Sequence, residues 1–235
     1  MRAKTIEYGR RCARYTLERN NGKHLSISVT PAGQVRVRVP AHAPDDEVHR
    51  RVQRRARWIF RQIDEFTELQ PVLKERRYVS GETHRYLGRQ YRLKVKAGTG
   101  RSVKLIGGFF EVYVPDRHDR ESIRRRLERW YRDQAVRVFD EAMRACLQAP
   151  SLRGISPPAL SIRFMSKRWG SCSKSGRILL NPLLVRTPRP CIEYVIAHEL
   201  CHLIEHNHGP AFYRLLSRVQ PDWRVRRERL SRCEA

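Results

Sequence analysis

A short apolar stretch, residues 194–203, carries two histidines and a glutamate at the spacing of a metal site. The pattern is His-Glu-x-x-His, made by His198, Glu199 and His202. On an α-helix, residues four apart lie on one face about 6 Å apart along the axis, so both imidazoles can point at one ion. The pattern therefore predicts a helix that holds a metal ion and places Glu199 beside it.

A catalytic zinc ion usually takes three protein ligands and leaves a fourth position for water. His206 and His208 compete for the third position. On a straight helix His206 lies about 12 Å from His198, too far for both to reach one zinc at about 2.1 Å. The breaker Gly209-Pro210 is expected to let the chain fold back after the helix, which favours His208. We therefore expect zinc on His198, His202 and His208, with His206 on the surface.

These residue types suit hydrolysis. Neutral imidazoles leave the zinc with its full charge, which lowers the pKa of bound water from about 15.7 towards 7. Glu199 can take that proton as general base and return it as general acid. Five-residue patterns also occur by chance on surface helices. Here the apolar run and the third histidine favour the metal site.

The 235 residues carry a net charge of +25, mostly from arginine: the 49 basic residues are 41 Arg and 8 Lys. Such a surface attracts nucleic acid, nucleotides or acidic proteins. Compositional bias towards arginine explains the same count without a ligand, and both explanations stay open. A hydrophobic content of 40% excludes wholesale disorder. The arginine-rich faces over residues 50–61 and 124–132 are the places where nonspecific nucleic acid or nucleotide binding would occur.

The cysteines indicate a reducing compartment. None of the six forms a CxxC pair, so the chain is no zinc ribbon, and their density is below that of a disulfide scaffold. The first residues have no apolar signal core, and no run approaches the ~20 apolar residues of a membrane span. We expect a soluble cytoplasmic protein with no membrane partner.

Two segments with strands and a helix are expected before the metal site. Residues 25–29 and 35–39 alternate with period two around Pro31-Ala32-Gly33, which predicts a hairpin, and a helix follows from Asp45. Candidate strands then cover residues 83–87, 90–97, 102–106 and 109–114 as a β-meander. A long helix from Asp119 or Ser122 runs to about Leu147.

The metal helix itself lies in a third segment. Residues 160–164 form a strand, and 169–172 with 178–181 form a hairpin beside the helix. Thr187-Pro188 is expected to supply the N-cap and first residue of that helix. Two helices near 210–219 and 222–233 complete the chain.

With these motifs assembled, the chain resembles the YgjP-like family of metal-dependent hydrolases, also described as an M48-type metallopeptidase domain. The resemblance covers residues from about 15 onward. It rests on the hairpin, on His-Glu-x-x-His and on Ala56-Arg57-Trp58-Ile59, Ser80-Gly81-Glu82, Tyr86-Leu87-Gly88-Arg89-Gln90-Tyr91, Trp130-Tyr131-Arg132 and Arg168-Trp169-Gly170-Ser171-Cys172. The ending Asn207-His208-Gly209-Pro210-Ala211-Phe212 is similar to the SprT and WLM proteases, whose third zinc ligand is a histidine at the matching place.

The resemblance implies an α+β fold with a zincin-like core. In such a core an antiparallel sheet lies above the His-Glu-x-x-His helix. The edge strand of that sheet, here residues 178–181, would bind an extended peptide by strand addition. One domain would span 15–235: hairpin and helix (15–75), meander and long helix (76–150), and zinc-binding core (151–235). Metzincins share the histidine spacing but have a glycine midway, where this chain has Glu205. In gluzincins the third ligand is a glutamate on a later helix, for which Glu228 is the candidate.

The leading hypothesis is a zinc peptidase in which Tyr213 or Arg168 helps polarise the substrate carbonyl. A second hypothesis keeps the site but makes the substrate a nucleoside triphosphate, since zinc hydroxide also attacks phosphorus. A third is a nucleic-acid-associated protein with a structural metal site. Structural zinc sites usually close with four protein ligands, and no fourth ligand is evident here.

Overall fold

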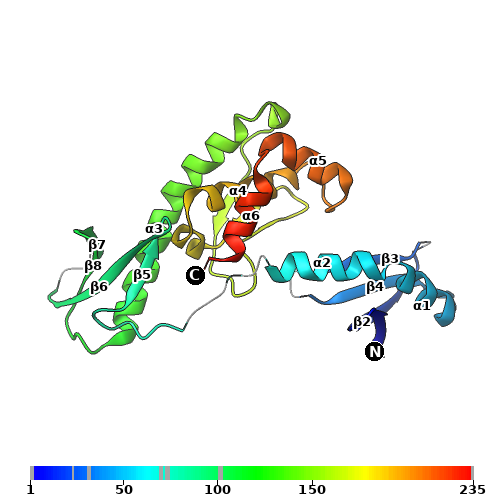
Figure 1. Ribbon diagram of the computed structural model, residues 1–235, viewed down its shortest axis with the longest axis horizontal. Helices are drawn as coiled ribbons and strands as arrows, with labels where there is room; N and C mark the ends of the chain where they lie inside the picture. Colours follow the sequence, from blue (N-terminus) through cyan, green and yellow to red (C-terminus); the bar gives the residue numbers. More distant parts are fainter. Residues whose placement is uncertain are drawn as a thin grey trace. The chain divides into compact units, whose positions relative to one another are not determined.

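The computed structural model describes residues 3–22, 24–30, 33–68, 71, 75–99 and 103–233, with the backbone alone for residues 3 and 65–68. The chain divides into two compact units, Met1–Gln70 and Pro71–Ala235. Figure 1 shows the first in blue to cyan and the second in green to red. The single domain predicted over 15–235, with its three segments, stays a prediction.

The first unit has a four-stranded sheet. Its strands are β1 (Ala3–Tyr8), β2 (Arg11–Asn20), β3 (Ser26–Val29) and β4 (Val35–Pro40). Their order is β1-β2-β4-β3, with β2 and β4 parallel and the other neighbours antiparallel. The predicted hairpin is confirmed as β3 and β4, while Pro31 and Ala32 of its turn lie outside the described residues. The sequence does not predict β1, because Ile6 is its one fully buried residue among charged neighbours.

Two helices cover one face of this sheet (Figure 1). They are α1 (Asp45–Arg54) and α2 (Ala56–Glu68), where the sequence predicts one helix from Asp45. The start is confirmed, and acidic residues in the first turn suit the helix dipole. Arg55, with φ of −95° and ψ of 4°, separates the two helices. Val48, Val52 and Ile59 are buried in one core with strand residues such as Val37.

The second unit begins with another four-stranded sheet, made of β5 (Thr83–Tyr86), β6 (Arg89–Ala97), β7 (Val103–Ile106) and β8 (Phe109–Val114). The order is β5-β6-β8-β7 with β6 and β8 parallel, so the predicted β-meander is wrong although its strands are present. Phe110, Val112 and Val114 on β8 are fully buried, whereas β7 has no buried residue. The most apolar strand therefore takes a central place and β7 an edge.

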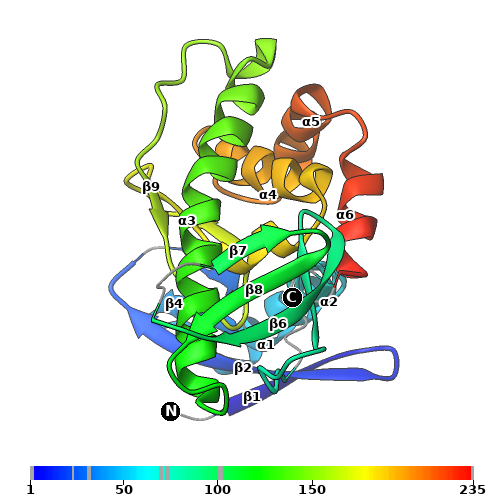
Figure 2. The same cartoon turned by 90° about the vertical axis from the view of Figure 1, so that its left-hand side faces the viewer.

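Helix α3 (Arg120–Leu147) connects this sheet to the rest of the unit (Figure 2). The Asp119 carboxylate accepts a hydrogen bond from the Ser122 N–H at 2.9 Å, which confirms Asp119 as the N-cap. Leu127, Tyr131 and Phe139 on its inner face are fully buried. They anchor the helix against both the sheet and the segment that follows.

A short mixed sheet lies beside the histidine-bearing helix. It contains β9 (Leu160–Ile162), β10 (Gly170–Cys172) and β11 (Ile178–Leu180) in the order β10-β11-β9. The hairpin of β10 and β11 is confirmed, but β9 pairs with β11 in parallel, so the expected antiparallel sheet is wrong. The expected edge strand at 178–181 is also wrong: fully buried Ile178 and Leu180 put β11 in the centre and leave β10 at an edge.

The remaining elements are helical: the 3-10 helices η1 (Pro150–Leu152) and η2 (Pro182–Arg186), then α4 (Arg189–Cys201), α5 (Pro210–Val219) and α6 (Trp223–Ser231). Thr187 does not cap α4. Its hydroxyl donates to the Leu184 carbonyl at 2.8 Å, and Pro188 occupies the N-cap. Within the described residues, no helix is long and apolar enough to cross a membrane.

Candidate metal centre

Helix α4 brings the predicted residues together at its end. Its residues are buried on nearly every side, as in a helix enclosed by a core. His198 and Glu199 lie in its last turn, and His202 is its C-cap residue. The helix therefore ends well before the breaker Gly209-Pro210. The loop that follows delivers His208 just before α5.

Three imidazoles converge at this point. The Nε2 atom of His208 lies 3.0 Å from Nε2 of His198 and 3.0 Å from Nε2 of His202. Among the described residues these three form the group whose possible ligand atoms all lie within 4.8 Å of one another. His206 is exposed and does not belong to the group. The structure thus brings together the three histidines named from the sequence and leaves His206 outside the group, while the binding of zinc by them stays a prediction.

The nitrogen atoms face one another in a way that suits a cation. The Nδ1 of His202 lies 3.1 Å from the Glu205 carbonyl oxygen, so a proton on Nδ1 leaves a lone pair on Nε2. His208 can donate one proton from Nε2, to one of its two neighbours only. The other contact then places two nitrogen atoms 3.0 Å apart with no proton between them, which leaves them repelling each other. Ligand nitrogens around a tetrahedral zinc lie about 3.3 Å apart, so an ion at the centre removes this repulsion with little movement.

Burial keeps the three rings neutral, as metal ligation requires. Burial, followed by the charges of His208, His202 and Arg227, holds the pKa of His198 well below its ordinary value. Burial lowers the pKa of His208 to about 3, with smaller contributions from His202 and Arg227. The pKa of His202 is also lowered, again mainly by burial. The Nδ1 of His198 is buried and has no hydrogen-bond partner in the described structure.

Phe212 supports all three rings. Its ring centroid lies 4.9 Å from that of His198 and 4.7 Å from those of His202 and His208. The side chain is fully buried on α5. From the sequence, Phe212 has no role beyond being the last residue of the motif at 207–212. Its position four residues after His208, one turn into a helix, is the signal that could have indicated it.

Glu199 is buried beside the triad and held by β10. Burial raises the pKa of its carboxyl to about 8, while the charge of Arg168 and the N–H of Cys172, which donates to it, act in the opposite direction. A Cβ atom at Gly170 would lie 2.8 Å from Glu199 Oε1. Gly170 is thus a position where the backbone must approach the carboxylate closely.

The other candidate residues named from the sequence differ in how they relate to the histidine group. Arg168 acts electrostatically on Glu199. The Tyr213 ring stacks on Trp223 at 5.4 Å, and its centroid is 6.4 Å from that of His208. Glu228 is exposed and paired with Arg232, outside the histidine group. Arg227, whose charge reaches two of the histidines, was missed because it belongs to an arginine run typical of a solvated helix face.

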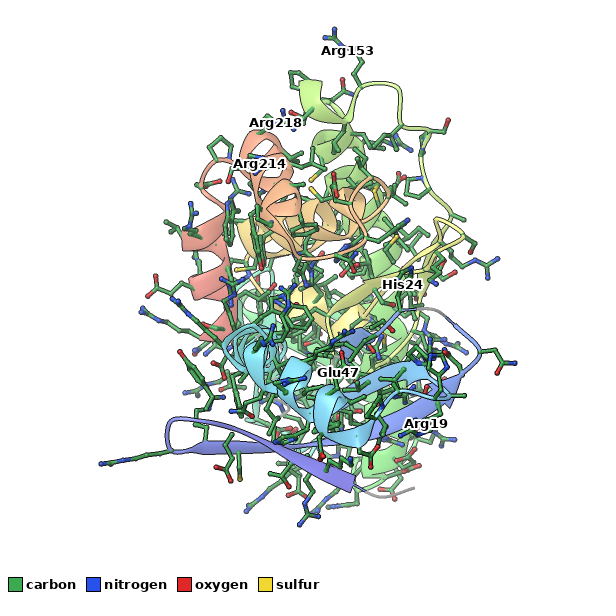
Figure 3. The ribbon with its side chains drawn as sticks, turned by 90° about the vertical axis from the view of Figure 1, so that its right-hand side faces the viewer. Arg19, His24, Glu47, Arg153, Arg214 and Arg218 are labelled. Atoms are coloured by element: carbon green, nitrogen blue, oxygen red, sulfur yellow. The ribbon has the colours of Figure 1, made fainter. Side chains whose placement is uncertain are left out.

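The basic faces differ in how far they are neutralised. On α3, Arg124 pairs with Glu121 and Glu128, and the Arg132 guanidinium lies over the Phe164 ring at 5.4 Å. Other arginines are scattered: Figure 3 labels Arg153, Arg214 and Arg218 in the second unit and Arg19 in the first. Net charge alone therefore selects no binding site.

Comparison with known proteins decides the family. Residues 23–233 match the family described as YgjP-like, metallopeptidase domain. The chain belongs to this family. Membership in a YgjP-like metallopeptidase family supports hydrolase activity and implies a metal, which the histidine group could hold. The match spans parts of both compact units.

Two further comparisons add little to the YgjP-like assignment. A search of curated proteins found no match. Among solved structures, the crystal structure of the metallopeptidase zymogen of Pyrococcus abyssi abylysin is similar, with a TM-score of 0.32 and 23% identity over 35% of this chain and 80% of that chain. A TM-score of this size carries no argument about fold or mechanism.

Proposed function

We propose that this protein is a zinc-dependent peptidase with a zincin-like active site. The observation that carries the proposal is the convergence of three neutral imidazoles, with Nε2 atoms 3.0 Å apart, beside a buried carboxyl group. His198, His202 and His208 would hold the ion. When bound there, zinc would act as a Lewis acid, which lowers the pKa of the attacking water and polarises the carbonyl of the substrate.

Glu199 is the proposed proton carrier. Its carboxylate would take a proton from the attacking water and give it to the amine leaving group, so that one water and one peptide bond become an acid and an amine. The pKa of this carboxyl group, which burial raises to about 8, supports a site that can hold the proton. A divalent cation nearby would favour the ionised form that the first transfer needs.

The substrate would bind along β10 and not along β11. Trp169 and Ser173 form backbone hydrogen bonds with Asn181 and Arg177 on the β11 side. In an antiparallel pair such contacts alternate, so the backbone groups of Gly170 and the carbonyl of Cys172 point to the free edge, while the Cys172 N–H on the same side donates to Glu199. That edge adjoins Glu199, where a peptide added as a further strand would have its carbonyl near the proton carrier.

The Glu199→Gln variant tests this assignment. Gln preserves the shape of the side chain but cannot take a proton, so we expect zinc content and folding to be retained while hydrolysis of a labelled unfolded protein falls about 10²–10⁴-fold. Glu228→Gln, at an exposed glutamate on α6, is the matched control and should keep wild-type activity.

The same assay separates the alternatives. Loss of zinc together with activity in Glu199→Gln would make Glu199 a structural residue. Full activity of a clean preparation would rule out its role. Hydrolysis of nucleoside triphosphates, with no cleavage of protein, would show that the same residues act on nucleotides and not on peptides.

A further inference from the structure

A stripe of basic and aromatic side chains runs across the junction of α1 and α2 in the first unit. Arg51, Arg54, Arg55 and Trp58 follow one another at i, i+3, i+4 and i+7, so they share one face even though Arg55 separates the helices. The neighbouring face is apolar and buried; it contains Val48, Val52, Ala56 and Ile59. Burial of that face fixes the direction in which the stripe points.

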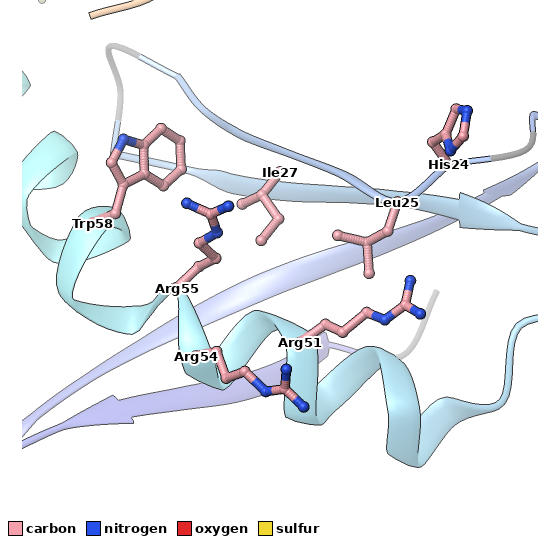
Figure 4. Close-up of a pocket in the computed structure, with 7 residues that line it drawn as sticks. All are labelled: His24, Leu25, Ile27, Arg51, Arg54, Arg55 and Trp58. Atoms are coloured by element: carbon pink, nitrogen blue, oxygen red, sulfur yellow. The ribbon is translucent and has the colours of Figure 1, made fainter. Parts of the chain in front are cut away.

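The stripe forms one wall of a cleft of about 630 Å³. The other wall consists of His24, Leu25 and Ile27, in and just before the edge strand β3. Figure 4 shows the Arg55 guanidinium between Trp58 and Ile27. Clefts of this size are typical of binding sites for small ligands or for one or two units of a polymer.

The cleft has an uncompensated positive charge. Among the residues that the structure describes, no carboxylate lines it. Arg51 pairs with Glu47, while Arg54 and Arg55 have no ion pair among the described residues. Two acidic side chains elsewhere in the unit are already paired: Asp45 with Lys4 and Arg19, and Asp64 with Arg11. An anionic ligand would therefore meet two free guanidinium groups.

Trp58 adds a flat apolar surface to this charge. It is half-buried against the core, with the rest of its indole at the cleft, and no other ring or guanidinium stacks on it in the part of the chain that the structure describes. A ligand that uses both features must carry phosphates and a planar group at short intervals. A phosphopeptide would use the arginines but has no need of the indole.

We propose that this cleft binds single-stranded nucleic acid, with a base stacked on Trp58 and flanking phosphates on Arg51, Arg54 and Arg55. Single strands fit better than a duplex because a paired base has no free face for stacking. The site lies wholly in the first unit and goes beyond the proposed peptidase activity. Half of the arginines at 50–61 line the cleft. Arg50 and Arg57 lie on the other flank of the same helices and do not line it.

Anisotropy titrations of the full-length protein with a labelled 12-nucleotide oligo(dT), at 50, 100 and 200 mM salt, test the proposal. Binding should weaken with salt by a log–log slope of about −0.7 for each phosphate contacted. Arg54→Glu combined with Arg55→Glu should lower affinity more than tenfold and flatten the slope. Trp58→Leu should lower affinity about 5- to 100-fold without changing the slope, since stacking releases no counterions.

The matched control combines Arg50→Glu with Arg57→Glu, which makes the same change in net charge on the same two helices. We expect less than a threefold loss from this pair. Equal losses from both pairs would show diffuse attraction by the overall charge and overturn the proposal. So would an unchanged affinity in a folded Trp58→Leu variant, no binding at 50 mM salt, or tighter binding of duplex DNA or of a phosphopeptide. If Trp58→Leu does not fold, the two arginine pairs still decide.

Discussion

Glu199 lies against a position where a side chain of any size would collide with it. A Cβ at Gly170 would be 2.8 Å from Oε1, 3.0 Å from Cγ of Glu199 and 3.1 Å from Cδ2 of Leu180. Gly170 does not have a positive φ, so the requirement for glycine comes from close approach and not from backbone strain. The position of the carboxylate is therefore set by the backbone of β10.

The Gly170→Ala variant should separate activity from folding. The nearest obstacle is the end of a flexible side chain, which can move by a few tenths of an ångström, so we expect thermal stability and zinc content close to wild type. Hydrolysis should fall about 10- to 100-fold, because small displacements of a catalytic group are costly. Steady-state kinetics beside zinc analysis measures both.

Ser171→Ala, one residue along the same strand, is the control for β10. Its change removes a hydroxyl and adds no atom near Glu199, so activity should remain. A Gly170→Ala enzyme as active as wild type would show that the carboxylate does not need its present position.

At the scale of single residues, the sequence predicted what depends on helical spacing. His198, Glu199 and His202 follow from the His-Glu-x-x-His pattern, and His208 follows from the reach of an imidazole. The contacts of Phe212 and Arg227 could not be predicted, because they depend on how α5 and α6 pack against α4. Packing across elements leaves no local pattern.

At the scale of elements, the strands were predictable but their neighbours were not. Period-two alternation located β3 and β4, and the turn residues between strands located β5, β6, β7 and β8, yet the order in each sheet depends on which strand buries most apolar surface. This is why the predicted meander and the predicted edge strand at 178–181 were wrong. The substrate edge changes accordingly from β11 to β10.

Strand β5 contributes a pH dependence to the stability of the second unit. His84 is fully buried, and its Nε2 lies 3.1 Å from Glu82. Burial, then the charges of Arg186 and Arg76, lower its pKa to about 4 against the attraction of Glu82. In the unfolded chain His84 takes up a proton near pH 6.5, whereas in the folded chain it does so only near pH 4. The free energy of unfolding is therefore highest above pH 6.5 and decreases as the pH falls towards 4.

Urea unfolding of wild type and His84→Gln at pH 7 and pH 4.5 measures this contribution. Gln can place an amide nitrogen near Glu82 but does not titrate. Wild type should lose about 2 kcal/mol more than the variant between the two pH values. Other histidines contribute equally to both proteins and cancel. Equal losses would show that His84 is protonated in the folded state without cost.

At the scale of the molecule, the two compact units separate the proposed activities. All three histidines, Glu199, Gly170 and Phe212 lie in Pro71–Ala235, whereas the basic cleft lies in Met1–Gln70. Sequence composition indicated the positive charge but could not tell which unit would use it to bind a ligand, because exposed arginines occur along both units. The cleft became visible only when β3 was placed opposite the α1–α2 junction.

We predict that a fragment of residues 71–235 folds and binds about one zinc ion, the same content that we expect for the full chain. It should also lose most oligonucleotide affinity. Far-ultraviolet circular dichroism, zinc analysis and the anisotropy titration measure these outcomes. A fragment that is unfolded with zinc present would show that the first unit is needed for the metal site.

The zinc content of four single alanine variants tests the central claim most directly. His198→Ala, His202→Ala and His208→Ala should each lose the ion after dialysis against a weak chelator, while His206→Ala, in the same loop but exposed, should keep about one zinc per chain. Elemental analysis of the four folded proteins gives the answer. Retention of zinc by His208→Ala together with its loss from His206→Ala would contradict the account.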